Sequence, residues 1–188
     1  MLDSLKHWYQ KLAVAKLPDT CVCLDTETSG LDPACAQLLS IGAVRIEHGV
    51  ILGEDKFHVV VKPDQAYPLD SVPIHRLRPR DVEQGIPVQA ALDALCLFIR
   101  HDPIVGYHIH FDRALLERAL GRPFDNRFLD VADIYHKRAH QKLAGNMAAG
   151  HVDLSFEVIC QQLDIPVIQR HTALGDALTT ALMYLKLR

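Results

Sequence analysis

The first third of the chain has the pattern of hydrophobic and polar positions that is typical of β-strands. A short apolar run at residues 20–24 predicts a buried strand. Residues 38–46 and 50–61 predict two further strands, and Glu47-His48-Gly49 between them favours a tight hairpin. Prolines 63, 68 and 73 then indicate a loop. The chain is therefore expected to begin its sheet with a strand and an antiparallel hairpin.

Helical spacing dominates the remainder of the sequence. Apolar residues at intervals of three and four predict helices over 88–100, 112–120, 131–143, 154–163 and 174–187. A further short strand is predicted at 104–107. Helices that alternate with short strands after a hairpin predict an α/β fold. We expect a mixed central β-sheet, with an antiparallel hairpin plus parallel strands, flanked by helices.

The N-terminal residues 1–18 form a separate amphipathic pattern. Leu5, Trp8, Tyr9 and Leu12 have the spacing of one buried helical stripe, and Pro18 ends it. We expect an N-terminal helix over 1–18 and a single domain over 19–188. The helix is a possible handle for docking a polymerase or a sister domain.

Composition narrows the class of protein. The chain has 188 residues, of which 49% are hydrophobic and 23% charged, as in ordinary globular domains. Its five cysteines are an odd number without a C-x-x-C pair, which argues against a disulfide framework or a zinc cage. The sequence has neither an apolar run long enough to span a membrane nor the pattern of a secretion signal. A cytoplasmic protein without a membrane partner is therefore expected. The net charge of −3 indicates that any nucleic acid is gripped locally rather than along a basic track.

The first candidate for chemistry is Asp25-Thr26-Glu27, which follows the buried run at 20–24. If the strand continues through it, both carboxylates point to the same face. Two such charges repel by roughly 4 kcal/mol at 4 Å and an effective dielectric near 20, so a positive group is expected between them. A solvated strand end is the alternative interpretation.

The same Asp-x-Glu pattern occurs once more, at Asp81-Val82-Glu83. It follows the loop-like Arg78-Pro79-Arg80 and resembles the acidic first turn of a helix. Only the first triplet ends an apolar strand and precedes Gly30. The two copies are therefore expected to have different roles.

The second candidate is Asp112, which follows Gly106-Tyr107-His108 and Phe111. Helical periodicity begins only after Asp112, which places its carboxylate at or just before a helix N-terminus. Asp is also a preferred N-cap residue, so a purely structural interpretation is open.

The third candidate is the pair His171 and Asp176 near the last predicted helix. Leu174, Leu178, Leu182 and Leu185 form a helical stripe with Ala181, and Asp176 lies about 200° around the helix from Leu174. Small neighbours, Ala173, Ala177 and Thr180, allow this side of the helix to approach a sheet or a ligand. His171 precedes the helix and can bring its ring to the same place, although a packed or solvated histidine is the alternative.

Taken together, the three segments would bring four carboxylates and one imidazole to one place. Oxygen ligands without sulfur favour Mg²⁺ or Mn²⁺ over zinc. An imidazole that titrates near neutrality suits a general base. Two such cations activate water and stabilise a leaving oxygen in the hydrolysis of a phosphodiester.

The three segments resemble the motifs of the DEDDh 3′–5′ exonucleases of the RNase H-like superfamily, which include the epsilon proofreading subunit of bacterial DNA polymerase III and RNase T. The resemblance covers roughly residues 20–187, and Gly106-Tyr107-His108 is most similar to a stand-alone epsilon-like branch. It implies an RNase H-like sheet and two divalent cations, Mg²⁺ or Mn²⁺, held by Asp25, Glu27, Asp112 and Asp176. It also implies that His171 takes a proton from the attacking water.

The resemblance further implies contacts with the terminal nucleotide. The positions concerned are Thr28, Gly30, Leu31, His75 and His108. Many relatives have Asn at the position of His108 and Gly at the position of Arg76, and both differences concern substrate choice more than reaction type.

Three functions remain open at this point. The leading hypothesis is a 3′–5′ exonuclease that releases 5′-mononucleotides from single-stranded or frayed DNA ends. The second is an exoribonuclease or oligoribonuclease that acts on RNA ends, since recognition of the 2′-hydroxyl cannot be assigned to a residue. The third is a partner subunit of a polymerase that binds nucleic-acid ends without turnover.

Overall fold

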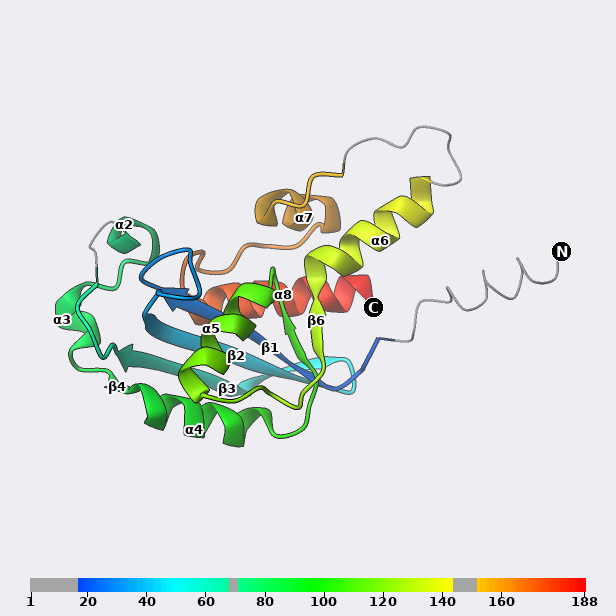
Figure 1. The fold of residues 1–188 in the computed structure, drawn as a ribbon. Coiled ribbons are helices and arrows are strands. Elements are labelled where there is room, and N and C mark those ends of the chain that lie inside the picture. The colour runs from blue at the N-terminus through cyan, green and yellow to red at the C-terminus, as the bar shows by residue number, and fades with distance from the viewer. Residues whose placement is uncertain (1–16, 68–70, 144–151) are drawn as a thin grey trace, which may run out of the picture.

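A six-stranded sheet forms the centre of the computed structural model, which describes residues 17–67, 71–143 and 152–188 (Figure 1). The strands are β1 (Cys21–Thr28), β2 (Leu38–Glu47), β3 (Val50–Lys62), β4 (Ile86–Pro87), β5 (Ile104–Gly106) and β6 (Phe128–Asp130). Their order across the sheet is β4-β3-β2-β1-β5-β6. Strands β1, β2 and β3 are antiparallel neighbours, whereas β5 is parallel to β1 and β6 is parallel to β5. The predicted mixed sheet is confirmed.

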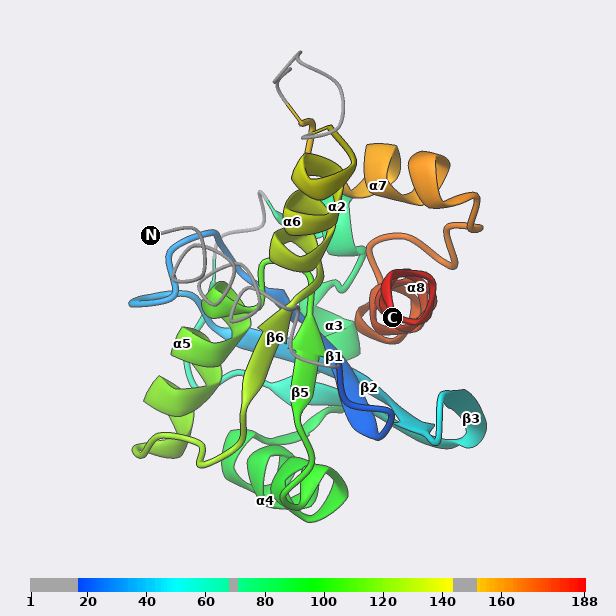
Figure 2. The same cartoon turned by 90° about the vertical axis from the view of Figure 1, so that its right-hand side faces the viewer.

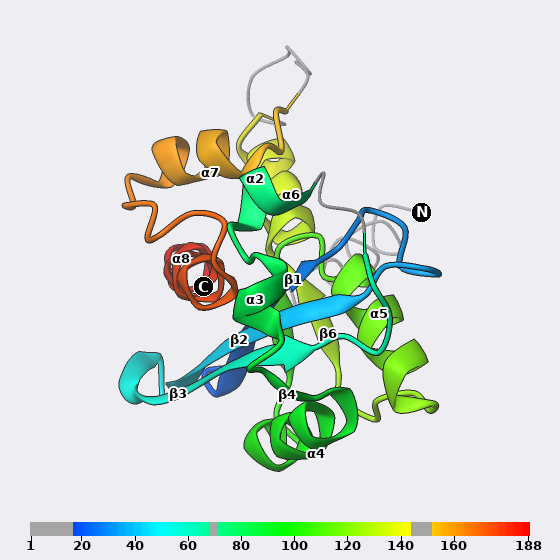
Figure 3. The same cartoon turned by 90° about the vertical axis from the view of Figure 1, so that its left-hand side faces the viewer.

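Helices cover both faces of this sheet. They are α2 (Val72–His75), α3 (Pro79–Val82), α4 (Val88–Ile99), α5 (His110–Leu120), α6 (Val131–Leu143), α7 (Phe156–Leu163) and α8 (Ala173–Leu187). Helices α4 and α5 lie on one face, and α8 lies on the other with α6 and α7 beside it (Figures 2 and 3). The sheet is therefore the middle layer between two sets of helices.

Alternation along β1 divides the core into two clusters. Cys21 and Cys23 are fully buried against α6, α7 and α8, whereas Val22 and Leu24 pack with α4 and α5 on the opposite face. These two cysteines serve as small core residues, as predicted, and all five cysteines of the chain are free. The same alternation sends the next odd-numbered residues of β1 toward α8.

The predicted hairpin lies between β2 and β3. Glu47 pairs with Val50, and the two intervening residues, His48 and Gly49, have φ values of 50° and 79°. Positive φ at both central positions is the geometry of the two-residue turn that suits twisted antiparallel strands. The two predicted strands are therefore joined by a tight hairpin, as expected.

Several short elements have no hydrophobic period in the sequence, although the acidic helical turn predicted at Asp81 is confirmed by α3. Strands β4 and β6 and helices α2 and α3 have two to four residues each, too few for a hydrophobic period to be visible. Helix α2 contains Pro73 near its start, where proline is tolerated because the first helical N–H groups have no partner. The predicted N-terminal helix lies almost entirely outside the described residues. Among the described helices, none combines the length and apolarity that crossing a membrane requires.

Candidate active site

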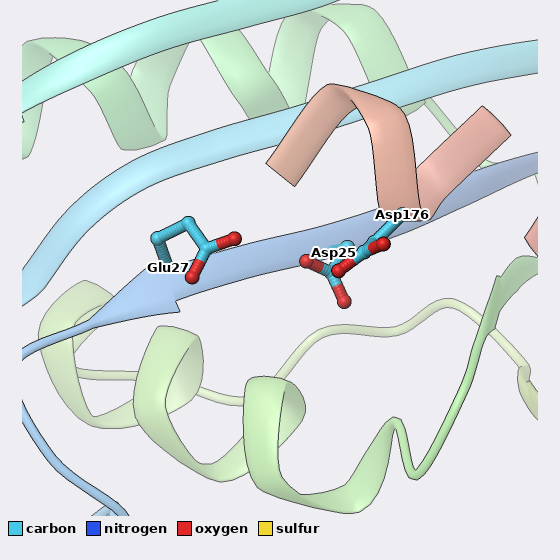
Figure 4. Close-up of side chains that lie close together, drawn as sticks. All are labelled: Asp25, Glu27 and Asp176. Carbon is cyan, nitrogen blue, oxygen red and sulfur yellow. The ribbon is translucent and has the colours of Figure 1, made fainter. Parts of the chain in front are cut away.

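Three carboxylates from two elements meet on the α8 face of the sheet (Figure 4). Asp25 and Glu27 come from β1, which continues through both residues, and Asp176 comes from the first turn of α8. One oxygen from each of the three lies within 4.8 Å of the others. Three of the five residues expected to act together are thus brought together, although 149 positions separate Glu27 from Asp176.

Small residues allow α8 to approach β1 and β2 closely. Gly42 of β2 lies opposite Asp25 in the strand register, and a Cβ atom there would lie 2.2 Å from the backbone carbon of Ala173. The small residues Ala173 and Ala177 are buried in the first turns of α8, as is Asp176 between them. The leucine stripe is only partly buried, so the side of the helix that carries the acid is the one against the sheet.

Asp112 belongs to the first turn of α5 rather than to its cap. The helix begins at His110, two residues earlier than expected, and Ile109 is the N-cap residue. Asp112 Oδ1 accepts hydrogen bonds from the backbone N–H of Thr26 (3.0 Å) and from its hydroxyl group (2.6 Å). Because β1 pairs with β5 only at Val22 and Cys23, Asp112 satisfies a backbone donor of β1 that lies beyond this pairing. The structural interpretation of Asp112 as an N-cap is therefore wrong.

Loss of hydration raises the pKa of all four candidate metal ligands. Burial raises the pKa of Asp25 well above its usual value, and the charges of Asp112, Asp176 and Glu27 raise it further. Burial raises the pKa of Glu27 to about 7. Burial also raises the pKa of Asp112 to about 7, although the hydrogen bonds from Thr26 lower it. Asp112 stands outside the group of three, but its charge is the largest one acting on Asp25. Carboxylates held this way are stabilised by a nearby cation.

Arg170 places a positive charge at Asp176, rather than between Asp25 and Glu27 where a positive group was expected. Its Nη1 donates to Asp176 Oδ2 at 2.5 Å, and its charge lowers the pKa of Asp25, Glu27 and Asp176 against the effect of burial. The only available signal was its position next to His171.

His171 also lies at Asp176. Its backbone N–H donates to Asp176 Oδ2 at 3.2 Å, and its backbone has a φ of 63°. Thr172 caps α8 by accepting from the N–H of Gly175, which fixes where the helix begins after His171. The backbone of His171 is thus fixed at Asp176.

The residues expected at the nucleotide have varied surroundings. Thr28 donates to the carbonyl of Gly30 (2.8 Å), and the apolar side chain of Leu31 beyond it is 93% exposed. His108 has an exposed side chain and a φ of 52°, and its N–H donates to Asp130 Oδ1 (3.2 Å). These positions are compatible with contacts to a ligand.

His75, in contrast, is occupied within its own segment. Its ring is buried, its Nδ1 accepts from the N–H of Leu77 (3.0 Å), and its Nε2 lies 3.0 Å from the Ser71 hydroxyl. Burial lowers the pKa of His75, in keeping with a neutral ring that orders this turn.

The donor set fits a hard divalent cation. All candidate ligands are carboxylate oxygens, which Mg²⁺ and Mn²⁺ prefer. In addition, Asp176 Oδ1 is buried and has no hydrogen-bond partner among the described residues. A buried acceptor without a donor is costly unless something positive binds it.

Comparison with known proteins agrees with this arrangement. The exonuclease family RNase_T matches residues 22–184, and the chain belongs to this family. It is 26% identical to the DNA polymerase III subunit epsilon of Rickettsia prowazekii, covering 88% of the chain and 72% of that protein. It is 25% identical to the PolC-type DNA polymerase III of Thermotoga petrophila, covering 89% of the chain but only 12% of the relative.

The fold has counterparts among solved structures. E. coli Exonuclease I in complex with a dT13 oligonucleotide matches 89% of this chain and 40% of its own chain, with a TM-score of 0.73 and 20% identity. The predicted membership of the DEDDh-type exonucleases and the RNase H-like sheet are both confirmed.

Proposed function

We propose that this protein is a metal-dependent 3′–5′ exonuclease that hydrolyses phosphodiester bonds at DNA 3′ ends and releases 5′-mononucleotides in the cytoplasm. The observation that carries the proposal is the convergence of Asp25, Glu27 and Asp176 within 4.8 Å, with Asp112 beside Asp25. A cluster with a strong mutual repulsion has no structural benefit to the fold, and a functional role accounts for it.

In this proposal Asp25, Glu27, Asp112 and Asp176 hold two divalent cations, Mg²⁺ or Mn²⁺. When bound, such a pair activates water and stabilises the leaving oxygen of a phosphodiester. Thr26 holds Asp112 in place through its two hydrogen bonds. His171 accepts the proton of the attacking water, a role that its position beside Asp176 supports.

The loop that follows β1 would receive the 3′-terminal nucleotide. Leu31 exposes an apolar surface on which a base can pack, and the Thr28–Gly30 contact orders the backbone directly after β1. His108 follows β5 by two residues, and its exposed ring can meet the sugar or phosphate. His75 would act indirectly by ordering its own turn.

DNA is the preferred substrate class in this proposal. E. coli Exonuclease I was solved with a DNA oligonucleotide, and the relatives named above are DNA polymerase III proteins. Because the chain matches a small part of the PolC-type polymerase, we propose that it acts beside a polymerase or a sister domain.

The deciding experiment uses 3′- and 5′-labelled single-stranded DNA and RNA of one sequence, with Mg²⁺, Mn²⁺ or chelator. We expect a 5′-labelled DNA strand to shorten stepwise from its 3′ end, with 5′-mononucleotides as products and no reaction in chelator. Faster digestion of RNA would transfer the function to an exoribonuclease. Binding of the ends without digestion in any metal would leave only the partner-subunit function.

A further inference from the structure

The guanidinium of Arg170 joins α7 to the carboxylate site. Its Nε donates to Glu157 Oε1 at 2.9 Å and its Nη1 donates to Asp176 Oδ2 at 2.5 Å. Its central carbon lies 4.1 Å from the centre of the Phe156 ring, within the range of a cation–π contact. The side chain is thus held by three groups in addition to its own backbone.

The two oxygens of Asp176 are in different situations. Oδ2 accepts from Arg170 Nη1 and from the backbone N–H of His171. Oδ1 is buried and has no partner among the described residues. The carboxylate lies next to that of Asp25 (Figure 4), so fixing Oδ2 also fixes the direction in which Oδ1 is presented.

We propose that Arg170 is a positioning residue for the metal site, which locks Asp176 through Oδ2 so that Oδ1 is presented to a divalent cation. This inference rests on the proposed function, because it requires the carboxylates to bind metal. Partners of this kind behind a metal ligand typically change metal affinity by about 10- to 100-fold. In this role, residue Arg170 must donate hydrogen bonds to Glu157 and to Asp176 at the same time.

Arginine suits this role better than lysine. The planar guanidinium presents several N–H groups in a fixed geometry, whereas the ammonium group of lysine is a compact point charge on a flexible stem. Arg170→Lys therefore keeps the positive charge beside Asp176 but removes the fixed orientation. This substitution separates positioning from simple charge compensation.

The chain offers a matched control at a second cluster of the same kind. Arg113 Nε donates to Glu117 Oε1 at 2.9 Å, and its central carbon lies 4.8 Å from the centre of the Phe128 ring. This arginine has the glutamate and the aromatic ring without the Asp176 contact. Arg113→Lys thus reproduces the loss of the Arg–Glu–Phe geometry away from Asp176.

The test is a Mn²⁺ titration of the purified protein, followed by calorimetry and by electron paramagnetic resonance of free Mn²⁺. We expect Arg170→Lys to weaken Mn²⁺ binding about tenfold and Glu157→Gln to weaken it several-fold. Arg113→Lys should bind as the wild type does. In nuclease assays, the Mn²⁺ concentration for half-maximal rate should rise with Arg170→Lys, and saturating Mn²⁺ should restore the rate.

The outcomes distinguish this inference from the proposed function. If the wild type binds Mn²⁺ and both Arg170→Lys and Glu157→Gln bind it equally well, Arg170 does not position Asp176. An equal loss of affinity in Arg113→Lys would also overturn the inference. A wild-type protein that binds no Mn²⁺ removes the metal-dependent function and this inference with it. Should Arg170→Lys fail to fold, Glu157→Gln alone decides, because it leaves Arg170 and Asp176 unchanged.

Discussion

The two Asp-x-Glu triplets of this chain have the same spacing and opposite electrostatics. At Asp25 and Glu27, burial and neighbouring acids raise the pKa of both groups, that of Glu27 to about 7. At Asp81, hydrogen bonds from the Arg78 side chain and backbone lower the pKa of the carboxyl to about 2. The first site disfavours negative charge unless a cation is bound. At the second site, the Arg78 side chain already supplies the positive charge.

The difference comes from what surrounds each triplet. The first lies on β1 with α8 packed directly over it, and it shares its space with Asp176. The second lies at the end of the four-residue helix α3, where Asp81 accepts from the N–H and Nε of Arg78 at 2.9 and 2.7 Å in a capping box. Residue spacing alone therefore identifies neither a metal site nor a helix cap, and the preceding strand or loop decides between them.

Neutralising one acid in each triplet gives the largest expected contrast. Asp25→Asn should lower the nuclease rate by more than about 1,000-fold, since a ligand of the proposed cations is lost. The folded state should remain, because the substitution removes a repelled charge. Asp81→Asn should leave the rate unchanged. Initial rates on labelled DNA, with circular dichroism as the check of folding, measure both. Full activity in Asp25→Asn would contradict the assignment of the site.

Removing the imidazole should have the next largest effect. His171→Ala is expected to slow hydrolysis by about 100- to 10,000-fold, the usual contribution of a general base. Mn²⁺ binding should change little, because the contact of His171 with Asp176 is made by its backbone. Rates measured across the pH range, beside a Mn²⁺ titration, test this. If metal affinity fell as much as the rate, His171 would be a structural support rather than a base.

Much of this contrast could be predicted from the sequence. Alternation along β1 was enough to place Asp25 and Glu27 on one face, and the small residues of α8 indicated a close approach to the sheet. The contact between Arg170 and Asp176 could not be predicted, because it depends on the path of the loop before α8. That path includes left-handed backbone at Gln169 (φ 41°) and at His171.

The first residue of α5 also could not be predicted from the hydrophobic pattern. Hydrophobic periodicity shows where a helix buries its apolar face, and the residues before the first buried leucine carry no such signal. Asp112 was therefore expected at the cap, whereas it lies inside the first turn and bonds to Thr26.

The close approach of α8 to the first triplet can be broken at Gly42. Gly42→Ala would place a Cβ atom 2.2 Å from the backbone of Ala173, so α8 must move away from the sheet and carry Asp176 with it. We expect a loss of about 1–3 kcal/mol in the free energy of unfolding and up to about a 100-fold lower rate. Urea denaturation and initial rates measure the two effects.

Gly53 on β3 is the control for that substitution. A Cβ atom there has no neighbour within 4 Å among the described residues, so Gly53→Ala should change neither stability nor rate appreciably. Equal behaviour of the two variants would mean that the contact between Gly42 and Ala173 does not set the position of Asp176.

The smallest expected effect concerns the different pKa shifts of Glu27 and Asp81. It is measured as the pH dependence of the free energy of unfolding, in the presence of a chelator. Glu27 keeps its proton in the folded protein up to about pH 7 but loses it near its usual value of 4.5 when unfolded. Folding therefore takes up a proton between these values, and stability should fall as the pH rises through this window. The difference is worth roughly 3 kcal/mol at most. Glu27→Gln should make the fall shallower in urea denaturation series at pH 5 to 8. Asp81→Asn should leave the slope in this window unchanged, because the stability due to Asp81 is lost only as the pH falls below 3.8 toward 2.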